Sequence, residues 1–410
     1  MKKTLLLIAT LLTSYVGMAQ ETYQPTAENL KAREQFQDEK FGIFLHWGLY
    51  SMMGTTEWIM TNRDINYKEY PKLAKTFYPS EFDADAWVKA IKAAGAKYIT
   101  ITTRHHDGFS LFKTATSSYN SVDGSPFKRD IIKEMADACQ RNGIKLHLYY
   151  SHLDWGREDY PVGRTGTGTG RPKEKANWAS YYKFMNTQLT ELLTNYGKVG
   201  AIWFDGWWDH DSDAKPFDWQ LEEQYAMIHK LQPQCLVANN HHHTPFPGED
   251  IQIFERDLPG ENKAGLSGQS IGRLPLESCQ TINEHWGYNI TDTLYKSPKE
   301  LIQMLVRAAG KNANLLLNIG PEPGGALPEL ALNRLQAIGK WLNQYGETIY
   351  GTRGGIIAPH EWGVSTQRGN KLYIHILNCM DSSLFIPTGN HKIKSATVFG
   401  TNKRVNFTKT

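Results

Sequence analysis

The sequence has little of what marks several large classes of protein. Its charges almost cancel, with 45 Lys and Arg against 42 Asp and Glu, which argues against a nucleic-acid-binding protein that depends on a broad cationic face. It has four cysteines and no CxxC pair, so a zinc knuckle or a redox dithiol is disfavoured. Beyond the amino terminus no apolar run approaches 18 residues, and we therefore expect no membrane span in the mature chain.

Several catalytic signatures are absent as well. The sequence has no HExxH zinc motif, no G-x-S-x-G serine elbow and no glycine fingerprint for a dinucleotide. Histidines at 105–106 and 241–243 are residue types that metal hydrolases use. Neighbouring residues of a strand point to opposite faces, so His105 and His106 are not expected to share an ion, and we predict neither a metal site nor a cofactor. The glycine-rich stretch 163–170 lacks the Gly-Lys-Ser/Thr ending of a phosphate-binding loop, and we expect a mobile surface loop there.

The amino terminus has the layout of a secretory signal peptide. A basic start at residues 1–3 precedes a mostly apolar stretch over 4–16 and the small residues around Ala19. We predict a signal peptide over 1–19 and an exported protein, periplasmic or secreted, with no lipid anchor because no cysteine lies beside the cleavage point. Export permits disulfides, so both disulfides and buried free thiols remain open for Cys139, Cys235, Cys279 and Cys379.

Short apolar runs alternate with amphipathic stretches between about residues 41 and 320. The apolar runs predict strands over 41–46, 98–104, 146–151, 200–205, 235–239 and 315–319. Helical spacing predicts helices over 84–94, 131–141, 178–196 and 221–231, another that begins after the capping signature at 297–300, and a closing helix over 328–345. This alternation predicts an α/β fold, a (β/α)8-like (TIM) barrel, over 20–350. Alternating runs at 371–377 and 394–398 predict a short C-terminal β domain over 351–410, not necessarily a complete sandwich.

Polar clusters follow the apolar runs, as expected where barrel chemistry gathers at the carboxyl ends of strands. Asp205 is the most prominent, because it ends an apolar run and has Trp203, Trp207 and Trp208 as close neighbours in the sequence. A carboxylate in such a place is costly without a partner or a task. A structural aspartate that caps the next turn is the alternative, since Asp-Gly is common in turns.

Hydrolysis of a glycoside needs a second carboxyl group on the other side of the bond. Four later acids compete for this role: Glu249, Glu255, Asp257 and Glu277. Glu255 follows apolar residues directly, and partial burial there is expected to raise its pKa towards the range of a general acid. Glu277 stands in a similar but weaker context, and a surface salt bridge is the alternative role for both.

These clusters resemble glycoside hydrolase family 29, the α-L-fucosidases. The resemblance extends over about 30–350 in consistent order. The matching motifs are Phe-Gly-Ile-Phe-Leu-His-Trp-Gly at 41–48, Glu-Trp at 57–58, Arg-His-His-Asp-Gly-Phe at 104–109, Tyr-Tyr-Ser at 149–151, Trp-Phe-Asp-Gly at 203–206 and Asn-Leu-Leu-Leu-Asn-Ile-Gly-Pro at 314–321.

The resemblance implies an exo-acting, retaining α-L-fucosidase that releases terminal α-L-fucose from fucosylated glycans or oligosaccharides, without metal or cofactor. Asp205 takes the place of the nucleophile, and Glu255 is the favoured acid/base with Glu277 as the alternative, since this residue varies in position between branches. Many members carry an arginine after the strand over 235–239, where this sequence has His241. The alternative function is a catalytically weak or inactive carbohydrate-binding homologue. Fucose contacts are implied for His46, Glu57, Trp58, His105, His106, Tyr149 and Trp203.

Overall fold

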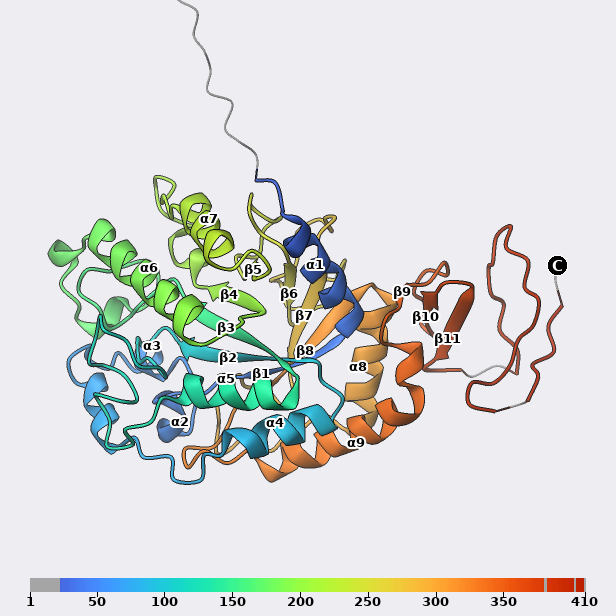
Figure 1. Ribbon diagram of the computed structural model, residues 1–410, viewed down its shortest axis with the longest axis horizontal. Helices are drawn as coiled ribbons and strands as arrows, with labels where there is room; N and C mark the ends of the chain where they lie inside the picture. The colour runs from blue at the N-terminus through green and yellow to red at the C-terminus, as the bar shows by residue number, and fades with distance from the viewer. Residues whose placement is uncertain (1–22, 380–381, 402, 409–410) are drawn as a thin grey trace, which may run out of the picture.

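The computed structural model describes residues 23–379, 382–401 and 403–408; the predicted signal peptide over 1–19 lies outside them. Eight parallel strands form one sheet in the order β5-β4-β3-β2-β1-β8-β7-β6. A parallel bridge between Ala238 and Ile251 joins its two ends, so the sheet closes into a TIM-like barrel (Figure 1) and confirms the predicted fold class. The strands are β1 (Phe41–Leu45), β2 (Tyr98–Arg104), β3 (Lys145–Ser151), β4 (Ala201–Asp205), β5 (Leu236–Asn239), β6 (Gln252–Glu255), β7 (Leu276–Thr281) and β8 (Ala313–Ile319).

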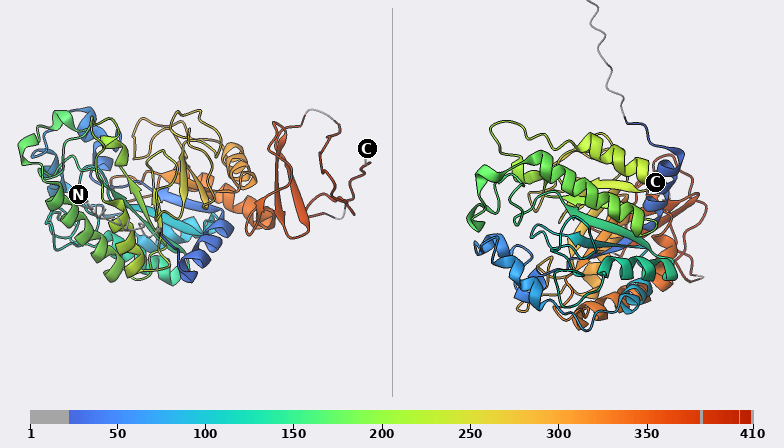
Figure 2. Two further views of the ribbon diagram at one scale, coloured as in Figure 1. Left: turned by 90° about the horizontal axis from the view of Figure 1, so that it is seen from above. Right: turned by 60° about the vertical axis from the view of Figure 1, so that its left-hand side comes forward.

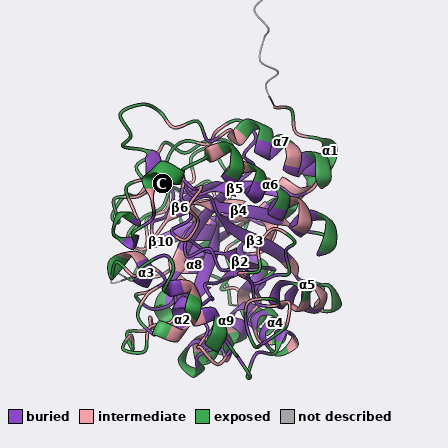
Figure 3. Cartoon of the chain, turned by 90° about the vertical axis from the view of Figure 1, so that its left-hand side faces the viewer, coloured by how far each residue is buried: buried purple, intermediate pink, exposed green. Residues whose placement is uncertain are grey.

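Long helices cover the outside of this barrel, with their exposed faces outward and the buried strands at the centre (Figure 3). They are α4 (Ala84–Ala93), α5 (Ile131–Asn142), α6 (Trp178–Asn195), α7 (Leu221–Leu231), α8 (Pro298–Gly310) and α9 (Glu329–Tyr345). The capping signature holds, because the Ser297 side chain accepts from the Glu300 backbone and the Glu300 carboxylate from the Ser297 backbone. None of the described helices is long and apolar enough to cross a membrane.

The barrel departs from eightfold regularity in two places. Irregular chain, without a helix in the described residues, follows β5 and β6. The connection between β1 and β2 is elaborated by α2 (Tyr50–Met53), α3 (Ile59–Asn62) and a 3-10 helix over Tyr70–Thr76. β6 and β7 themselves were not predicted. The loops after β5 and β6 contribute Asn240, His242 and Leu266 to the cavity at the carboxyl ends of the strands.

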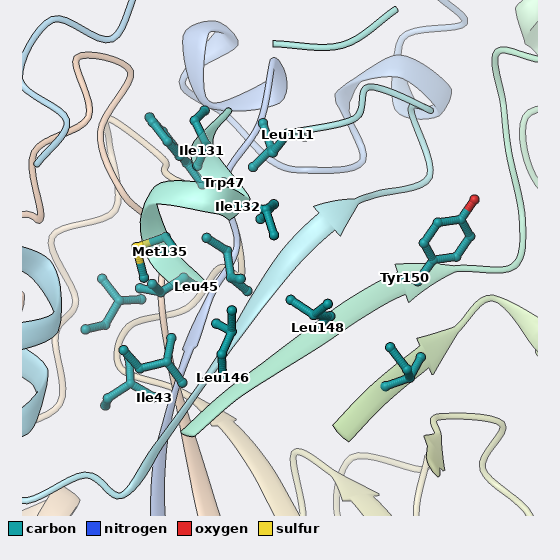
Figure 4. Packing of buried hydrophobic residues seen from close by; sticks show 14 of the residues in the cluster. Ile43, Leu45, Trp47, Leu111, Ile131, Ile132, Met135, Leu146, Leu148 and Tyr150 are labelled. Carbon is teal, nitrogen blue, oxygen red and sulfur yellow. The ribbon is translucent and has the colours of Figure 1, made fainter. Parts of the chain in front are cut away.

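Packing between the strands and the outer helices forms the main core. Outward-facing Ile43 and Leu45 of β1 and Leu146 of β3 gather against Ile132 and Met135 of α5 (Figure 4). Strands buried on both faces explain why the sequence shows near-continuous apolar runs instead of alternation. Three cysteines contribute as buried free thiols: Cys139, Cys235 and Cys279.

The amino end of the barrel is closed by α1 (Ala27–Glu39), which the sequence analysis did not predict. Phe36 inserts among the interior side chains, with its ring centroid 5.4 Å from that of Tyr98. The Asn314 amide donates to the carbonyl of Phe36 at 2.7 Å, and Arg33 pairs with buried Asp250 at 2.5 Å. The carboxyl end is therefore where a ligand can enter.

A small antiparallel sheet follows the barrel, as the predicted fold class requires. It has the order β11-β10-β9 and lies beside α8 and α9, at one side of the barrel (Figure 2). A Cβ at Gly310 of α8 would stand 2.5 Å from Val364 Cβ, so this helix and β10 approach closely. The expected strand at 394–398 is wrong, since only a single bridge, Thr397 to Arg404, forms there. The strands are β9 (Arg353–Gly354), β10 (Gly363–Arg368) and β11 (Lys371–Ile376).

A buried ion pair fixes the carboxyl ends of β2 and β3. Arg104 ends β2 and pairs with Asp154, which follows β3; their side chains are 1% and 0% exposed. Asp154 also accepts the backbone N–H groups of Gly156 and Arg157 at 2.6 and 3.0 Å. The pair therefore joins the end of β2 to the segment that follows β3.

We predict that Asp154→Ala strongly destabilises the protein, because it leaves the Arg104 guanidinium buried without its counter-charge. Removal of one partner of a buried pair costs about 3–5 kcal/mol. Urea unfolding followed by tryptophan fluorescence measures the change. Asp85→Ala, which removes the exposed partner of Arg141, is the matched control and should barely move the midpoint; equal midpoints for both variants would contradict the prediction.

Candidate active site

One cavity of about 190 Å³ opens at the carboxyl ends of the strands. Every residue that the resemblance assigned lines it, except Tyr149 and the alternative acid Glu277. The assigned residues that line the cavity are His46, Glu57, Trp58, His105, His106, Trp203, Asp205 and Glu255. Segments that lie more than 200 residues apart in the sequence thus meet at one edge of the barrel, as parallel strands require.

Asp205 is the last residue of β4 and sits in a shell of hydrogen-bond donors. The Tyr149 hydroxyl donates to Oδ2 at 3.0 Å. The Gly206 N–H and the Trp208 indole N–H donate to Oδ1 at 2.8 and 3.0 Å. Gly206 has φ 92°, which suits glycine and turns the chain so that this donor faces the carboxylate. Tyr149, which does not line the cavity, orients Asp205 through its hydroxyl hydrogen bond.

Burial and, to a lesser extent, the charge of Glu255 together raise the pKa of Asp205 to about 6. The hydrogen bonds from Trp208 and Tyr149 oppose this rise. The His106 imidazole adds a contact, with Nε2 3.6 Å from Oδ2. A carboxylate ionised at neutral pH, yet poorly solvated, is suited to act as a nucleophile.

Glu255 ends β6 and faces Asp205 across the cavity. Its Oε2 accepts from the Asn240 amide at 2.8 Å and from His242 Nε2 at 2.9 Å. The same Asn240 amide lies 3.4 Å from Asp205 Oδ1. Asp205 Oδ1 and Glu255 Oε2 both contact this amide nitrogen, at 3.4 and 2.8 Å. The two oxygens are therefore closer to each other than the roughly 6.5 Å at which the carboxyl spacing of inverting enzymes begins.

The expected rise in the pKa of Glu255 does not occur. Burial raises it, but the hydrogen bond and charge of His242 and the Asn240 amide bring it below its ordinary value. Burial alone could be anticipated from the sequence, because the contact of Glu255 with His242 is not visible in a linear pattern.

Glu277 does not face the cavity. It lies inside the barrel on β7, where Oε1 accepts from the Trp203 indole at 2.9 Å and Oε2 from the Tyr98 hydroxyl at 2.7 Å. Burial raises its pKa to about 7. Glu277 therefore holds the Trp203 indole through the hydrogen bond to Oε1. The other two candidates also lie elsewhere, since Glu249 accepts from Tyr225 and contacts His241, and Asp257 accepts backbone N–H groups of its own loop.

His105 and His106 lie side by side, with ring centroids 4.1 Å apart, so the expectation that they face opposite ways is wrong. They follow the end of β2 in a turn, where strand alternation no longer applies. Ser151 Oγ donates to the Leu153 carbonyl and so accepts from His106 Nδ1 at 2.6 Å. His46 Nδ1 donates to Asn318 Oδ1 in the same manner, at 2.6 Å, because the Asn318 amide donates to the Trp286 carbonyl.

These histidines are uncharged acceptors. Burial lowers the pKa of His46 to about 3 and that of both other imidazoles well below the usual value. With Nδ1 as the donor, Nε2 of His46 and of His106 is left to accept a hydroxyl hydrogen. In the described part of the chain no three His, Cys, Asp or Glu side chains converge as a metal site would require.

Aromatic rings form the walls. Trp58 stacks on Trp208 with centroids 5.5 Å apart, and Trp203 stacks on Tyr149 at 5.6 Å. Trp208 was visible beside Asp205 in the sequence, but several other lining residues were missed because they belong to segments after β5, β6 and β7. The lining residues not assigned from the sequence are Phe44, Arg164, Trp208, Asn240, His242, Leu266, Cys279 and Trp286.

The glycine-rich stretch 163–170 is a surface loop, as expected, with four of its eight residues exposed, but hydrogen bonds hold it beside the site. The backbone and hydroxyl of Thr165 both donate to buried Asp209, at 2.8 and 2.6 Å. The Gly166 N–H donates to Thr61 Oγ1 at 2.9 Å. These contacts bring Arg164 to the cavity, where its guanidinium lies 5.2 Å from the Trp208 ring.

His241, which stands where many α-L-fucosidases have an arginine, turns away from the cavity. Its Nε2 lies 3.0 Å from Glu249 Oε1 in the protein interior. The next residue, His242, enters the cavity in its place.

Two carboxylates held within reach of one amide, in a pocket of neutral histidines and indoles at the top of a barrel, are the apparatus of a glycoside hydrolase. The sequence model of the Alpha-L-fucosidase family matches residues 10–347. The chain belongs to this family, as the motifs predicted.

Individual relatives agree. The chain is 30% identical to plasma alpha-L-fucosidase of Rattus norvegicus over 406 residues, 90% of this chain and 82% of that protein. Alpha-L-fucosidase isoenzyme 1 from Paenibacillus thiaminolyticus superposes with TM-score 0.81 at 35% identity, over 93% of this chain and 91% of that one. A GH29 alpha-L-fucosidase from Bacteroides thetaiotaomicron, solved as a trapped covalent intermediate with 2-fluoro-fucosyl fluoride, superposes with TM-score 0.80 at 28% identity, over 95% and 92% of the two chains.

Proposed function

We propose that this protein is an exo-acting, retaining α-L-fucosidase that releases terminal α-L-fucose from fucosylated glycans or oligosaccharides. The observation that carries the proposal is the close spacing of Asp205 and Glu255 across one cavity. The cavity, about 190 Å³, is smaller than the ~300 Å³ at which sites for drug-sized ligands begin. That size suits a single terminal sugar rather than a stretch of chain.

The reaction proceeds in two halves. Asp205 Oδ attacks C1 of fucose while Glu255 gives its proton to the glycosidic oxygen, so that a C1–O ester forms and the C1–O bond to the aglycone breaks. Glu255, now a carboxylate, then takes a proton from water as the water oxygen bonds C1 and the ester bond breaks. Two inversions at C1 retain its configuration.

Sugar recognition follows from the neutral imidazoles and the indoles. His46 and His106 accept hydroxyl hydrogens, and Glu57, fixed by the Gly287 N–H at 3.0 Å, offers a further acceptor. The faces of Trp58 and Trp203 suit the C–H side of the ring and the C6 methyl group. The presence of both carboxylates in one cavity favours an enzyme over an inactive carbohydrate-binding homologue.

We predict that 2-fluoro-fucosyl fluoride labels Asp205 once per chain, because fluorine at C2 slows hydrolysis of the ester. Peptide mapping by mass spectrometry locates the label, and L-fucose should slow labelling by competition. Asp205→Ala should lose the label and reduce turnover of an aryl α-L-fucoside on the order of 10³-fold or more. A label on any other residue would remove Asp205 from the mechanism.

The acid/base assignment is tested by comparing Glu255→Ala with Glu277→Ala. We expect Glu255→Ala to lose about 10²–10⁴-fold in kcat/KM on a fucosylated oligosaccharide, far less on an aryl fucoside with a good leaving group, and to be accelerated by azide. Glu277→Ala should slow both substrates alike and ignore azide, because its loss releases Trp203. The reverse pattern would assign the role to Glu277.

We also propose that the protein acts outside the cytoplasm, in the periplasm or beyond. The support is the basic, apolar and small-residue layout of residues 1–19. A mature chain that begins near Gln20, found by amino-terminal sequencing, is the expected result, and a chain that keeps residues 1–19 would contradict it.

A further inference from the structure

The loop after β5 is constructed to present one side chain to the cavity. His242 has a left-handed backbone, with φ 66°, a strained conformation that persists only where the surrounding structure imposes it. Its neighbours do so. His241 is anchored on Glu249, and the His243 N–H donates to His241 Nδ1 at 2.9 Å. His242 is thereby turned into the cavity, where its side chain is 20% exposed.

The contacts of Glu255 are one-sided. Asn240 and His242 both donate to Oε2, whereas Oε1 has no hydrogen-bond partner among the described residues. Two donors on one oxygen fix the rotation of the carboxyl group. The oxygen that must meet the glycosidic bond is left free for the substrate.

We propose that His242 is a positioning residue for Glu255, which holds Oε2 so that Oε1 meets the glycosidic oxygen, and which stabilises the carboxylate between the two halves of the reaction. This inference rests on the proposed acid/base role of Glu255. In the first half Oε1 loses its proton to the leaving oxygen while His242 and Asn240 donate to Oε2. In the second half Oε1 regains a proton from water, so His242 Nε2 needs to lose none.

The His242 imidazole affects the pKa values of both carboxylates. His242 favours the ionised form of Glu255 and of Asp205, so the apparent pKa values belong to the group as a whole. Loss of the imidazole removes the contact that lowers the pKa of Glu255 and leaves the burial that raises it. The titratable groups that line the cavity around the pair are Asp205, His46, Glu57, His105, His106, Arg164 and Cys279, and Arg256 lies beside Glu255. His243 of the same loop is coupled to His242 but is not among the groups that shift the pKa of Glu255.

The experiment compares His242→Gln, which keeps an N–H donor without an ionisable ring, with His242→Ala, which keeps neither. The pH dependence of kcat/KM is measured on a fucosylated oligosaccharide and on an aryl fucoside. The alkaline limb reports loss of the acid's proton, so His242→Ala, which removes both the hydrogen bond and the charge that lower the pKa of Glu255, should move it upward. His242→Gln, which keeps an N–H donor, should move it in the same direction by less. His242→Ala should in addition lose about 10-fold or more on the oligosaccharide and much less on the aryl fucoside, and His242→Gln should restore most of this loss.

His243→Gln is the matched control, because His243 is exposed and does not contact Glu255; its profile should equal that of the wild type. An unmoved alkaline limb in both His242 variants, or an equal loss on both substrates at every pH, would overturn the positioning role. Failure of the proposed function looks different: the wild-type protein would not hydrolyse either fucoside, or azide would accelerate Glu277→Ala instead of Glu255→Ala.

Discussion

Two carboxylates share one poorly solvated cavity, and their mutual repulsion is the constraint that the surrounding structure has to satisfy. Hydrogen bonds from Tyr149, Gly206 and Trp208 stabilise the charge of Asp205 against this repulsion. Asn240 and His242, which both donate to Oε2, stabilise the charge of Glu255. The Asn240 amide reaches both. The two environments thus differ: burial and the neighbouring charge raise the pKa of Asp205, whereas His242 and Asn240 lower the pKa of Glu255.

The barrel makes this arrangement possible because the residues that line the cavity come mostly from the carboxyl ends of strands and the loops that follow them. β4 contributes Asp205, β6 contributes Glu255, and the turn after β2 contributes two histidines. This turn begins directly after Arg104, which is paired with Asp154. Closure of the opposite end by α1 leaves a single mouth. Chemistry is therefore confined to one rim, while the other supports packing.

The parts of the fold that could be predicted were those with continuous apolar runs, such as β1 to β5 and β8, and the helices between them. β7 was missed because Glu277 interrupts its pattern, and only the structure reveals that Trp203 and Tyr98 satisfy this buried acid. α1 was missed because its contact with the barrel depends on Phe36 within a mostly polar segment. The site was predicted as far as motifs extend. His242 and Trp286 lie in irregular loops, whose course depends on tertiary contacts that no periodicity encodes.

The joint between β5 and β6 has a mechanical consequence. Elsewhere in the barrel neighbouring strands pair over extended ladders, but here one bridge, Ala238 to Ile251, and a few hydrogen bonds around Asp250 hold the edges together. Asp205 lies on one side of this seam and Glu255 on the other. The distance between the attacking oxygen and the protonating oxygen is thus set across the pair of neighbouring strands with the fewest ladder contacts in the barrel. A sugar ring that contacts both Asp205 and Glu255 would link the two strand edges and restrain their separation.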